Sequence, residues 1–206
     1  MKVAIVGGTG DFGRALAKRL EAAGDDVVIG SRDAERARSA AEELGVRGGP
    51  NQEVVRGADL VVLAVTAGAA VQTARSLARA IGSTPLLSVA SELRFGEAGV
   101  RPGSERVSVA EQVAAIVPGP VAAGLHSLAA SNLAGKRPPD EDALVCGDDA
   151  RAKELSLEVA SRVVAGQAFD AGSLANARVL EGLTAVIVSL NRRYKGHAGL
   201  RITGLA

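Results

Sequence analysis

The stretch VAIVGGTGDFG, residues 3–13, decides the fold of this chain. An apolar strand expected over 2–6 runs directly into Gly8, Gly10 and Gly13, and a helix is expected over 12–23. Glycines at this spacing allow a tight turn, close approach of a pyrophosphate and close packing of helix on strand. The N–H groups of the helix N-terminus then bind the phosphates. The stretch predicts a dinucleotide-binding turn, with the intervening residues Thr9, Asp11 and Phe12 as further cofactor contacts.

The second strand, expected over 26–30, indicates which dinucleotide is bound. A site for NAD places Asp or Glu roughly 20 residues after the glycines, where it binds the ribose 2′-hydroxyl. This chain has Ser31 and Arg32 at that place and Arg36 one helical turn later. An arginine on a surface turn is often only solvated. Because the acidic residue is missing and a hydroxyl and two guanidinium groups replace it, we predict an NADP(H) site.

Strand and helix patterns alternate along the chain, which predicts an α/β fold with a doubly wound, mostly parallel sheet of the Rossmann type. A small C-terminal helical or α/β cap is expected to follow it. Charge and prolines over 135–141 suggest a boundary, so we expect an NADP-binding domain over 1–138 and a small domain over 139–206. The later strands are expected over 60–65, 85–89, 121–124, 143–146 and 167–170. The later helices are expected over 34–44, 52–55, 71–81, 107–116, 150–164 and 174–194, with a loop over 96–104 and a docking segment over 201–206.

Composition excludes several classes of protein. The formal net charge of +1 gives no long-range attraction to nucleic acid or an acidic membrane, and the chain holds only three phenylalanines and one tyrosine for stacking bases. No apolar stretch is long enough to span a bilayer, and the first strand leaves no room for a signal peptide. One cysteine fits a reducing cytoplasm, which is the expected location. No cluster of His, Cys and Asp has metal-ligand spacing, so we expect no metal.

Loops at the carboxyl ends of the later strands form the ligand crevice in this architecture. Small residues after the strand over 60–65 would let a flat ring approach the backbone, although Thr66 can equally be a plain helix cap. We assign Val65, Thr66 and Ala67 to the cofactor. Ser88 and Ala90, after the strand over 85–89, have the same geometry and are assigned to a second substrate.

His126 and Ser127 follow the strand over 121–124 and are expected to meet the same substrate. His126 is the candidate catalytic residue, because an imidazole can donate a hydrogen bond that positions a hydride acceptor. A buried histidine satisfied by backbone is an equally good interpretation. The chain shows no Ser/His/Asp set and no Tyr-x-x-x-Lys pair. This favours an acceptor that is itself a delocalised ring and needs positioning rather than acid–base help.

Four stretches together resemble the NADPH-dependent coenzyme F420 reductases. They are IVGGTGDFG at 5–13, VIGSR at 28–32, LHS at 125–127 with VCGDD at 145–149, and DAGSL at 170–174. The resemblance continues through Asn176, Arg178, Glu181 and Leu183 and thus covers nearly the whole chain.

The resemblance implies an oxidoreductase that transfers a hydride between NADP(H) and coenzyme F420, its small-molecule co-substrate, without a metal. Thr9, Ser31, Arg32 and Arg36 would bind NADP. The loops after the strands over 60–65 and 85–89, with His126 and Ser127, would line the deazaflavin site. The C-terminal helix would close the crevice and form a homodimer, and its apolar faces agree with a buried partner surface.

This chain departs from the family's usual pattern in the loops 66–69, 88–93 and 127–132, which contain no proline. Two alternatives therefore stay open. One is a reductase of another small acceptor on the same scaffold, such as an imine, a quinone or a chelated metal. The other is a protein that senses NADP(H) without turnover.

Overall fold

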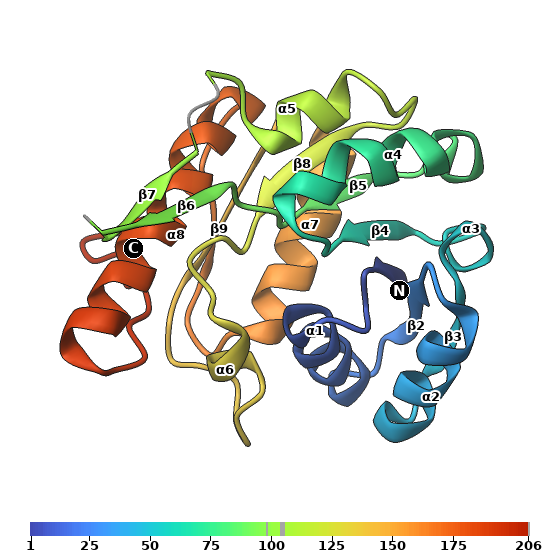
Figure 1. Cartoon of the computed structure of the whole chain (residues 1–206), viewed down its shortest axis with the longest axis horizontal. Coiled ribbons are helices and arrows are strands. Elements are labelled where there is room, and N and C mark those ends of the chain that lie inside the picture. Colours follow the sequence, from blue (N-terminus) through green and yellow to red (C-terminus); the bar gives the residue numbers. More distant parts are fainter. Residues whose placement is uncertain (98, 104–105, 206) are drawn as a thin grey trace.

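The apolar runs predicted as strands lie at the centre of one twisted sheet (Figure 1). The computed structural model describes residues 1–97, 99–103 and 106–205. Within them, eight strands follow the order β10-β9-β8-β5-β4-β1-β2-β3, and only β8 and β9 pair antiparallel. The strands are β1 (Lys2–Val6), β2 (Asp26–Ser31), β3 (Arg47–Pro50), β4 (Leu60–Leu63), β5 (Leu86–Ser88), β8 (Val121–Gly124), β9 (Ala143–Gly147) and β10 (Ala168–Asp170). This confirms the predicted Rossmann-type, mostly parallel sheet.

Helices cover both faces of the sheet, because its central strands are apolar on both sides. Along β1, Val3 and Ile5 belong to one core cluster, and Ala4 and Val6 belong to the other. Figure 1 shows α4 and α5 above β4 and α1 below it. The face on the side of Val3 and Ile5 carries α1 (Asp11–Ala22), α2 (Ala34–Leu44), α6 (Ala130–Leu133) and α7 (Ala150–Val163). The face on the side of Ala4 and Val6 carries α3 (Asn51–Val54), α4 (Ala67–Ile81), α5 (Val109–Ala114), the 3-10 turn η1 (Leu174–Asn176) and α8 (Ala177–Tyr194).

The ends of α2 are fixed by local chemistry, as predicted. The Asp33 side chain accepts hydrogen bonds from the backbone N–H groups of Glu35 (3.0 Å) and Arg36 (3.1 Å). Gly45 ends the helix in the left-handed region, at φ 70°. This cap fixes where the first turn of α2, which carries Arg36, begins after β2.

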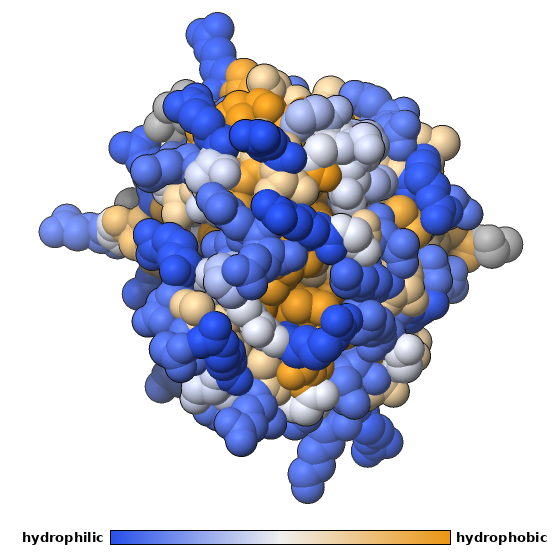
Figure 2. Space-filling model, turned by 90° about the vertical axis from the view of Figure 1, so that its right-hand side faces the viewer, coloured by the Kyte–Doolittle hydropathy of each residue, from blue (hydrophilic) through white to orange (hydrophobic). Residues whose placement is uncertain are grey.

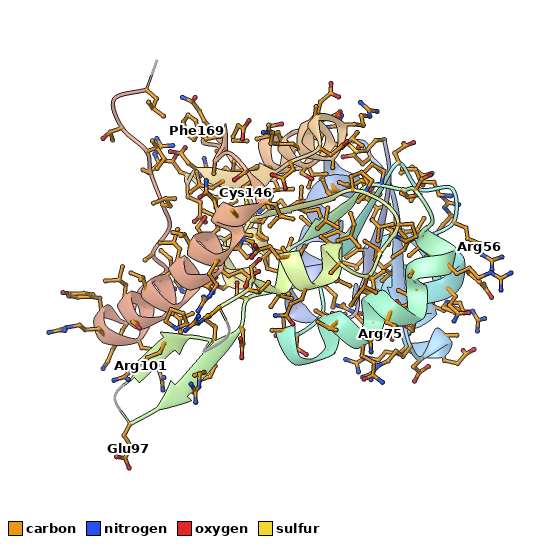
Figure 3. All side chains as sticks on the ribbon, turned by 90° about the horizontal axis from the view of Figure 1, so that it is seen from above. Arg56, Arg75, Glu97, Arg101, Cys146 and Phe169 are labelled. Carbon is orange, nitrogen blue, oxygen red and sulfur yellow. The ribbon has the colours of Figure 1, made fainter. Side chains whose placement is uncertain are left out.

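The structure differs from the prediction at several elements. The loop over 96–104 is largely an antiparallel hairpin of β6 (Leu93–Gly96) and β7 (Gly99–Pro102), although Ala98 and Ser104 lie outside the described residues. Figure 3 shows this hairpin projecting beside α8, with Glu97 at its tip. The short strand β3 and the helix α6 were not predicted. The helix expected over 107–116 is shorter, because the Ser108–Glu111 capping box starts it at Val109.

The C-terminal residues extend the same sheet, since β9 and β10 lie beyond the position predicted as a boundary at 138. The division into domains 1–138 and 139–206 stays a prediction. In the tail, the Ile202 N–H donates to Asp142 Oδ2 (2.6 Å), so the described part of the segment over 201–206 docks as expected. Ala206 lies outside the described residues.

A buried carboxylate joins α8 to the rest of the fold. Glu181 is 2% exposed and accepts hydrogen bonds from the N–H groups of Val109 and Ala110, both at 3.1 Å. These two N–H groups belong to the first turn of α5, so the carboxylate caps that helix from another element. Burial raises the pKa of Glu181, and the two hydrogen bonds oppose this rise.

The face at the β3 edge, seen in Figure 2, is mostly hydrophilic, with hydrophobic residues exposed only in small patches between charged ones. Among the helices that the structure describes, none combines the length and the apolar character needed to cross a membrane.

Candidate cofactor and substrate site

The strand order reverses between β1 and β4, and this is where open α/β sheets bind their ligands. The loops after β1, β2 and β4 meet there around a cavity of about 280 Å³. Seven of the residues predicted to bind the cofactor line it: Thr9, Gly10, Ser31, Arg32, Arg36, Val65 and Thr66. The structure therefore brings together residues that lie up to 57 positions apart in the sequence.

Different constraints require glycine at different positions of the turn after β1. Gly7 adopts φ +82°, and a Cβ there would lie 2.5 Å from the carbonyl oxygen of Ala64. A Cβ on Gly13 would lie 2.6 Å from the carbonyl oxygen of Gly7, so close packing of α1 on the turn requires glycine. Gly10 is exposed, and a Cβ there would meet only the Gly7 oxygen, at 3.5 Å. Since no contact within the described protein excludes a side chain at Gly10, this position is the one left open for a ligand.

Two helix N-termini border the same cavity. Gly10 is the N-cap of α1 and Thr66 is the N-cap of α4, and no side chain of the described residues caps either helix. The first N–H groups of a helix carry partial positive charge and need an acceptor. The arrangement is suited to bind an anionic group between the turn after β1 and the start of α4.

The cavity has a basic end. Arg32 and Arg36 are exposed, and within the described residues neither guanidinium group makes an ion pair or a side-chain hydrogen bond. The Ser31 hydroxyl accepts a hydrogen bond from the Asp33 N–H (3.2 Å), which leaves its own proton for another acceptor. A hydroxyl beside two unpaired guanidinium groups matches the chemistry of a phosphate.

A larger cavity of about 590 Å³ continues from this basic end, sharing Ser31 and Arg32 with the first. Asn51 lines both cavities and is 8% exposed, and its Oδ1 has no hydrogen-bond partner in the part of the chain that the structure describes. An orphaned buried acceptor of this kind fits a donor supplied by a ligand. Figure 3 shows Arg56, at the outer side of this cavity, extending outward. Sequence reasoning missed the following lining residues: Asn51, Arg56, Ala69, Gln72, Thr73 and Ser76.

The remaining predicted cofactor residues do not line the 280 Å³ cavity. Gly8 and Gly13 are buried within the turn, and Phe12 packs against the core. Asp11 lines a separate hollow beside α1. Ala67 is the first residue of α4 and packs against the second core cluster. These residues shape the turn, and direct contact with a cofactor stays a prediction for them.

The residues predicted for the second substrate lie together at the ends of β5 and β8, which are neighbours in the sheet. Ser88, Ala90, His126 and Ser127 are between 0% and 5% exposed. The hydroxyls of Ser88 and Ser127 and both ring nitrogens of His126 are buried, and none has a hydrogen-bond partner within the described residues. A ligand would reach these polar atoms only after neighbouring groups move aside. Four orphaned polar atoms in one place also form a poorly satisfied core, which a bound ligand would relieve.

Burial keeps His126 neutral. It lowers the pKa of the imidazole to about 4, and a polar contact with the backbone of Ala90, whose geometry is too poor for a hydrogen bond, opposes this only in part. A neutral imidazole carries one donor and one acceptor nitrogen, so it can position a polar ring but carries no charge near neutral pH. The backbone before it is strained, because Leu125 has φ 64° and is not glycine.

Cys146 is buried in β9, and burial raises the pKa of its thiol to about 12. It is thus a protonated core residue, as expected. Among the described residues, no group of three or more His, Cys, Asp and Glu side chains is arranged to hold a metal ion.

Comparisons with known proteins agree with this geometry. The family described as NADP oxidoreductase, coenzyme F420-dependent, matches residues 2–92. The F420-dependent NADP reductase of Methanothermobacter marburgensis is 37% identical over 100% of this chain and 99% of its own length. This chain belongs to the F420-dependent NADP reductase family. The reductase of Methanocaldococcus jannaschii is 31% identical over 100% of this chain and 99% of its own.

Among solved structures, a putative F420-dependent NADP reductase from Arthrobacter sp. FB24 superposes with a TM-score of 0.84. It is 26% identical, and the match covers 99% of this chain and 100% of the other. The family resemblance expected from the sequence is thereby confirmed over the full chain.

The two glycines Gly10 and Gly13 give a first prediction. Gly13→Ala forces a methyl group to 2.6 Å from the Gly7 oxygen and should lower the free energy of unfolding by about 1–3 kcal/mol. Gly10→Ala should change this energy by less than about 1 kcal/mol but should weaken NADPH binding, because its methyl group projects where no protein atom crowds it. Denaturant unfolding and NADPH titration of both variants measure the two effects. Wild-type NADPH affinity in Gly10→Ala would contradict the assignment of the cavity.

Proposed function

We propose that this chain binds NADP(H) in the two joined cavities and catalyses hydride transfer between NADP(H) and coenzyme F420. The observation that carries the proposal is the basic end of the cavity. Ser31, Arg32 and Arg36 line the cavity beside the turn after β1, and among the described residues no carboxylate pairs with either arginine. Full-length relatives with 31–37% identity bear the name F420-dependent NADP reductase, which supports the same acceptor here.

Each part of NADP has a matching set of residues. Gly10, Thr9 and the N-terminus of α1 would hold the pyrophosphate. Ser31, Arg32 and Arg36 would hold the 2′-phosphate. The larger cavity, with the orphaned Oδ1 of Asn51, has room for the adenosine end.

The nicotinamide end would lie toward the residues that follow β4, namely Val65, Thr66 and Ala67. When bound, nicotinamide carbon 4 exchanges a hydride directly with carbon 5 of the deazaflavin ring. Both partners are delocalised rings, so the protein needs to orient them and exclude water rather than supply a proton.

For the acceptor, we propose that Ser88, Ala90, His126 and Ser127 line its site. Neutral His126 and the two hydroxyls offer donors and acceptors to a polar ring edge. Because these groups are buried, binding of the acceptor is coupled to local movement of the loops after β5 and β8. The cytoplasm is the proposed location, since a single cysteine fits a reducing compartment.

The direct test follows the absorbance of NADPH during its oxidation by purified protein with coenzyme F420 as acceptor. We expect turnover with NADPH and far weaker turnover with NADH at equal concentrations, because NADH lacks the phosphate that the basic end binds. Tight NADPH binding without oxidation by coenzyme F420 would contradict the proposal. It would favour a different acceptor if another compound supports turnover, or a sensor if none does.

Arg32→Ala provides the matched variant for the same assay. A charge-assisted hydrogen bond contributes about 1.5–3 kcal/mol, so the apparent KM for NADPH should rise about 10- to 150-fold. Turnover at saturating NADPH should change little, because the phosphate lies far from the reacting carbon. Arg38→Ala is the control, since Arg38 is an exposed arginine of α2, the helix that follows Arg32, and pairs with Glu35 outside the cavity.

We also propose that the partner of this chain is a second copy of itself, bound through α8. Four large apolar side chains are exposed along this helix: Val179 (71%), Val186 (53%), Leu190 (38%) and Tyr194 (72%). Their spacing places them on one face, opposite the buried Ala177 and Glu181. An exposed apolar stripe of this kind is typical of a protein interface.

The mass in solution tests the homodimer. Light scattering of the wild-type protein should give twice the chain mass of 20.8 kDa. Val186→Glu should give the monomer mass, because it places a charge in the centre of the stripe. Val107→Glu, which changes an exposed residue on another segment, should leave the dimer intact. A wild-type monomer, or a dimer unaffected by Val186→Glu, would contradict the proposed interface.

A further inference from the structure

One buried cation lines neither cavity of the proposed cofactor site. Arg19 lies in the last turn of α1 and is 9% exposed, and among the described residues no carboxylate pairs with it. Its Nε donates a hydrogen bond to the carbonyl oxygen of Leu133 (2.7 Å), and its Nη2 donates to the carbonyl oxygens of Gly135 and Arg137. A charged group at this depth needs its donors satisfied, and here backbone oxygens satisfy them.

The three carbonyl groups belong to the end of α6 and to the segment that follows it. The helix spans only Ala130–Leu133, and no side chain of the described residues caps its N-terminus. A helix of one turn is not stable on its own, and its last carbonyl groups have no partner within it. The planar guanidinium group of Arg19 supplies the missing donors, because it can reach several oxygens at once. Arg19 therefore clamps α6 and residues 133–137 onto α1, beside which α6 lies (Figure 1).

Apolar packing supports the same contact. Leu133 is 1% exposed and belongs to the core cluster that contains Leu16 and Leu20 of α1. On its other side, α6 is joined to the residues before β9, because Asn132 Nδ2 donates to Glu141 Oε1 (3.1 Å). Among the described residues, Arg19 is the polar side chain that joins α6 to α1.

The helix α6 continues directly from the turn that carries the proposed acceptor residues. The N–H groups of Asn132 and Leu133 both donate to the carbonyl oxygen of Ala129, at 3.0 and 3.1 Å. Within the turn, the Leu128 N–H donates to the carbonyl oxygen of Leu125 (3.1 Å). The strained φ of 64° at Leu125 persists only because the surrounding structure fixes it. The strand β8 fixes the turn from one end, and α6 fixes it from the other.

The helix that holds α6 is also the helix that starts at the cofactor turn. Gly10 is the N-cap of α1, and Gly13 packs closely on Gly7. The first turn of α1 thus borders the cofactor cavity, and its last turn holds α6. Hydride transfer between two rings requires a defined separation and orientation. A common support for both halves of the proposed site provides it.

We propose that Arg19 is a positioning residue for the hydride acceptor. By clamping α6 onto α1, it fixes the turn with His126 and Ser127 relative to the cofactor turn. Its side chain lies outside the cofactor cavities and acts through α6. This inference rests on the proposed function for the kinetic part of its test, and on the structure alone for the hydrogen-exchange part.

The experiment compares Arg19→Met with Arg19→Lys. Methionine keeps an apolar stem but removes every donor, and lysine keeps the charge without the planar fork. A small misplacement of the reacting groups is costly, so kcat/KM for coenzyme F420 should fall about 10- to 100-fold in Arg19→Met. Arg19→Lys should show a smaller fall, and the KM for NADPH should stay within about 2-fold of wild type in both variants.

Lys18→Met is the matched control. Lys18 is the exposed neighbour of Arg19 and lines the hollow between α1 and α6. Among the described residues its ammonium group makes no hydrogen bond or ion pair. The substitution removes a positive charge from the same helix without removing a donor to the carbonyl groups, so kcat/KM for coenzyme F420 should stay at the wild-type value.

Hydrogen exchange gives a readout that does not depend on turnover. Mass spectrometry of peptides compares residues 125–137 with α4, which lies on the other face of the sheet. In Arg19→Met the amides of 125–137 should exchange about 10-fold faster, since they lose charge-assisted hydrogen bonds, and those of α4 should not change. Thermal unfolding checks that each variant is folded at the assay temperature. If Arg19→Met is not folded, Arg19→Lys carries the same test.

The possible results separate the two proposals. If wild type fails to reduce coenzyme F420 but exchange still rises over 125–137 alone, the proposed function fails and the clamp on the turn stands. If wild type is active while Arg19→Met keeps wild-type kcat/KM for the acceptor, or if exchange over 125–129 is unchanged, the positioning role is wrong. Equal losses toward NADPH and coenzyme F420, or faster exchange in α4 as well, would also overturn it, because they indicate a general structural defect.

Discussion

The packing of α1 against the turn after β1 is the constraint on which the rest of the site depends. Gly13 lies so close to Gly7 that any side chain there would displace the helix. This contact fixes the N-terminus of α1 at the carboxyl end of the central strand. Since β1 pairs with both β2 and β4, the loops after these strands then converge on the same point. The basic end at Ser31 and Arg32 and the start of α4 are therefore placed by the sheet, while Gly10 leaves the space that they surround.

The two halves of the site are built on different principles. The proposed cofactor half is an open cavity whose arginines make no ion pair, and whose helix N-termini have no side-chain cap, among the described residues, so it can bind an anion without rearrangement. The proposed acceptor half is closed, and its polar atoms are buried without hydrogen-bond partners among the described residues. Such a cluster costs stability in the free protein, and a ligand that satisfies it recovers that cost. This difference in exposure favours binding of NADP(H) to a preformed site and binding of the second substrate to a site that adapts to it.

The sequence predicted the elements whose signals are local. The glycine spacing defined the turn after β1, and Asp33 and Gly45 defined both ends of α2. The strand β3 has the sequence RGGP, which carries no strand signal, and it is extended because it pairs with β2 at the sheet edge. The hairpin β6–β7 is rich in glycine and arginine, and its order depends on packing beside α8. Tertiary contacts decide both elements, so they could not be read from local pattern.

In the candidate site, too, residues with a local sequence signal were predicted and residues placed by tertiary contacts were missed. Ser31, Arg32 and Arg36 followed from their spacing after the glycines, and the structure places them together. Asn51 was missed because it begins a helix after the unpredicted strand β3. Gln72 and Thr73 are helix-surface residues of α4, and only the packing of α4 beside α3 makes them part of a cavity. The sequence left open whether His126 is buried, because a polar residue after a strand is also typical of an accessible loop position, and the structure buries it.

Direct hydride transfer at this edge of the sheet is the central claim, and an isotope experiment tests it most directly. NADPH deuterated on carbon 4, on the face from which the enzyme removes hydrogen, is oxidised by coenzyme F420 in ordinary water, and the reduced coenzyme is analysed by mass spectrometry. Two-electron transfer within the joined site predicts one deuterium per reduced coenzyme, on carbon 5 of the deazaflavin. Reduced coenzyme without deuterium, from NADPH labelled on either face, would show that the hydrogen exchanges with solvent and would contradict direct transfer.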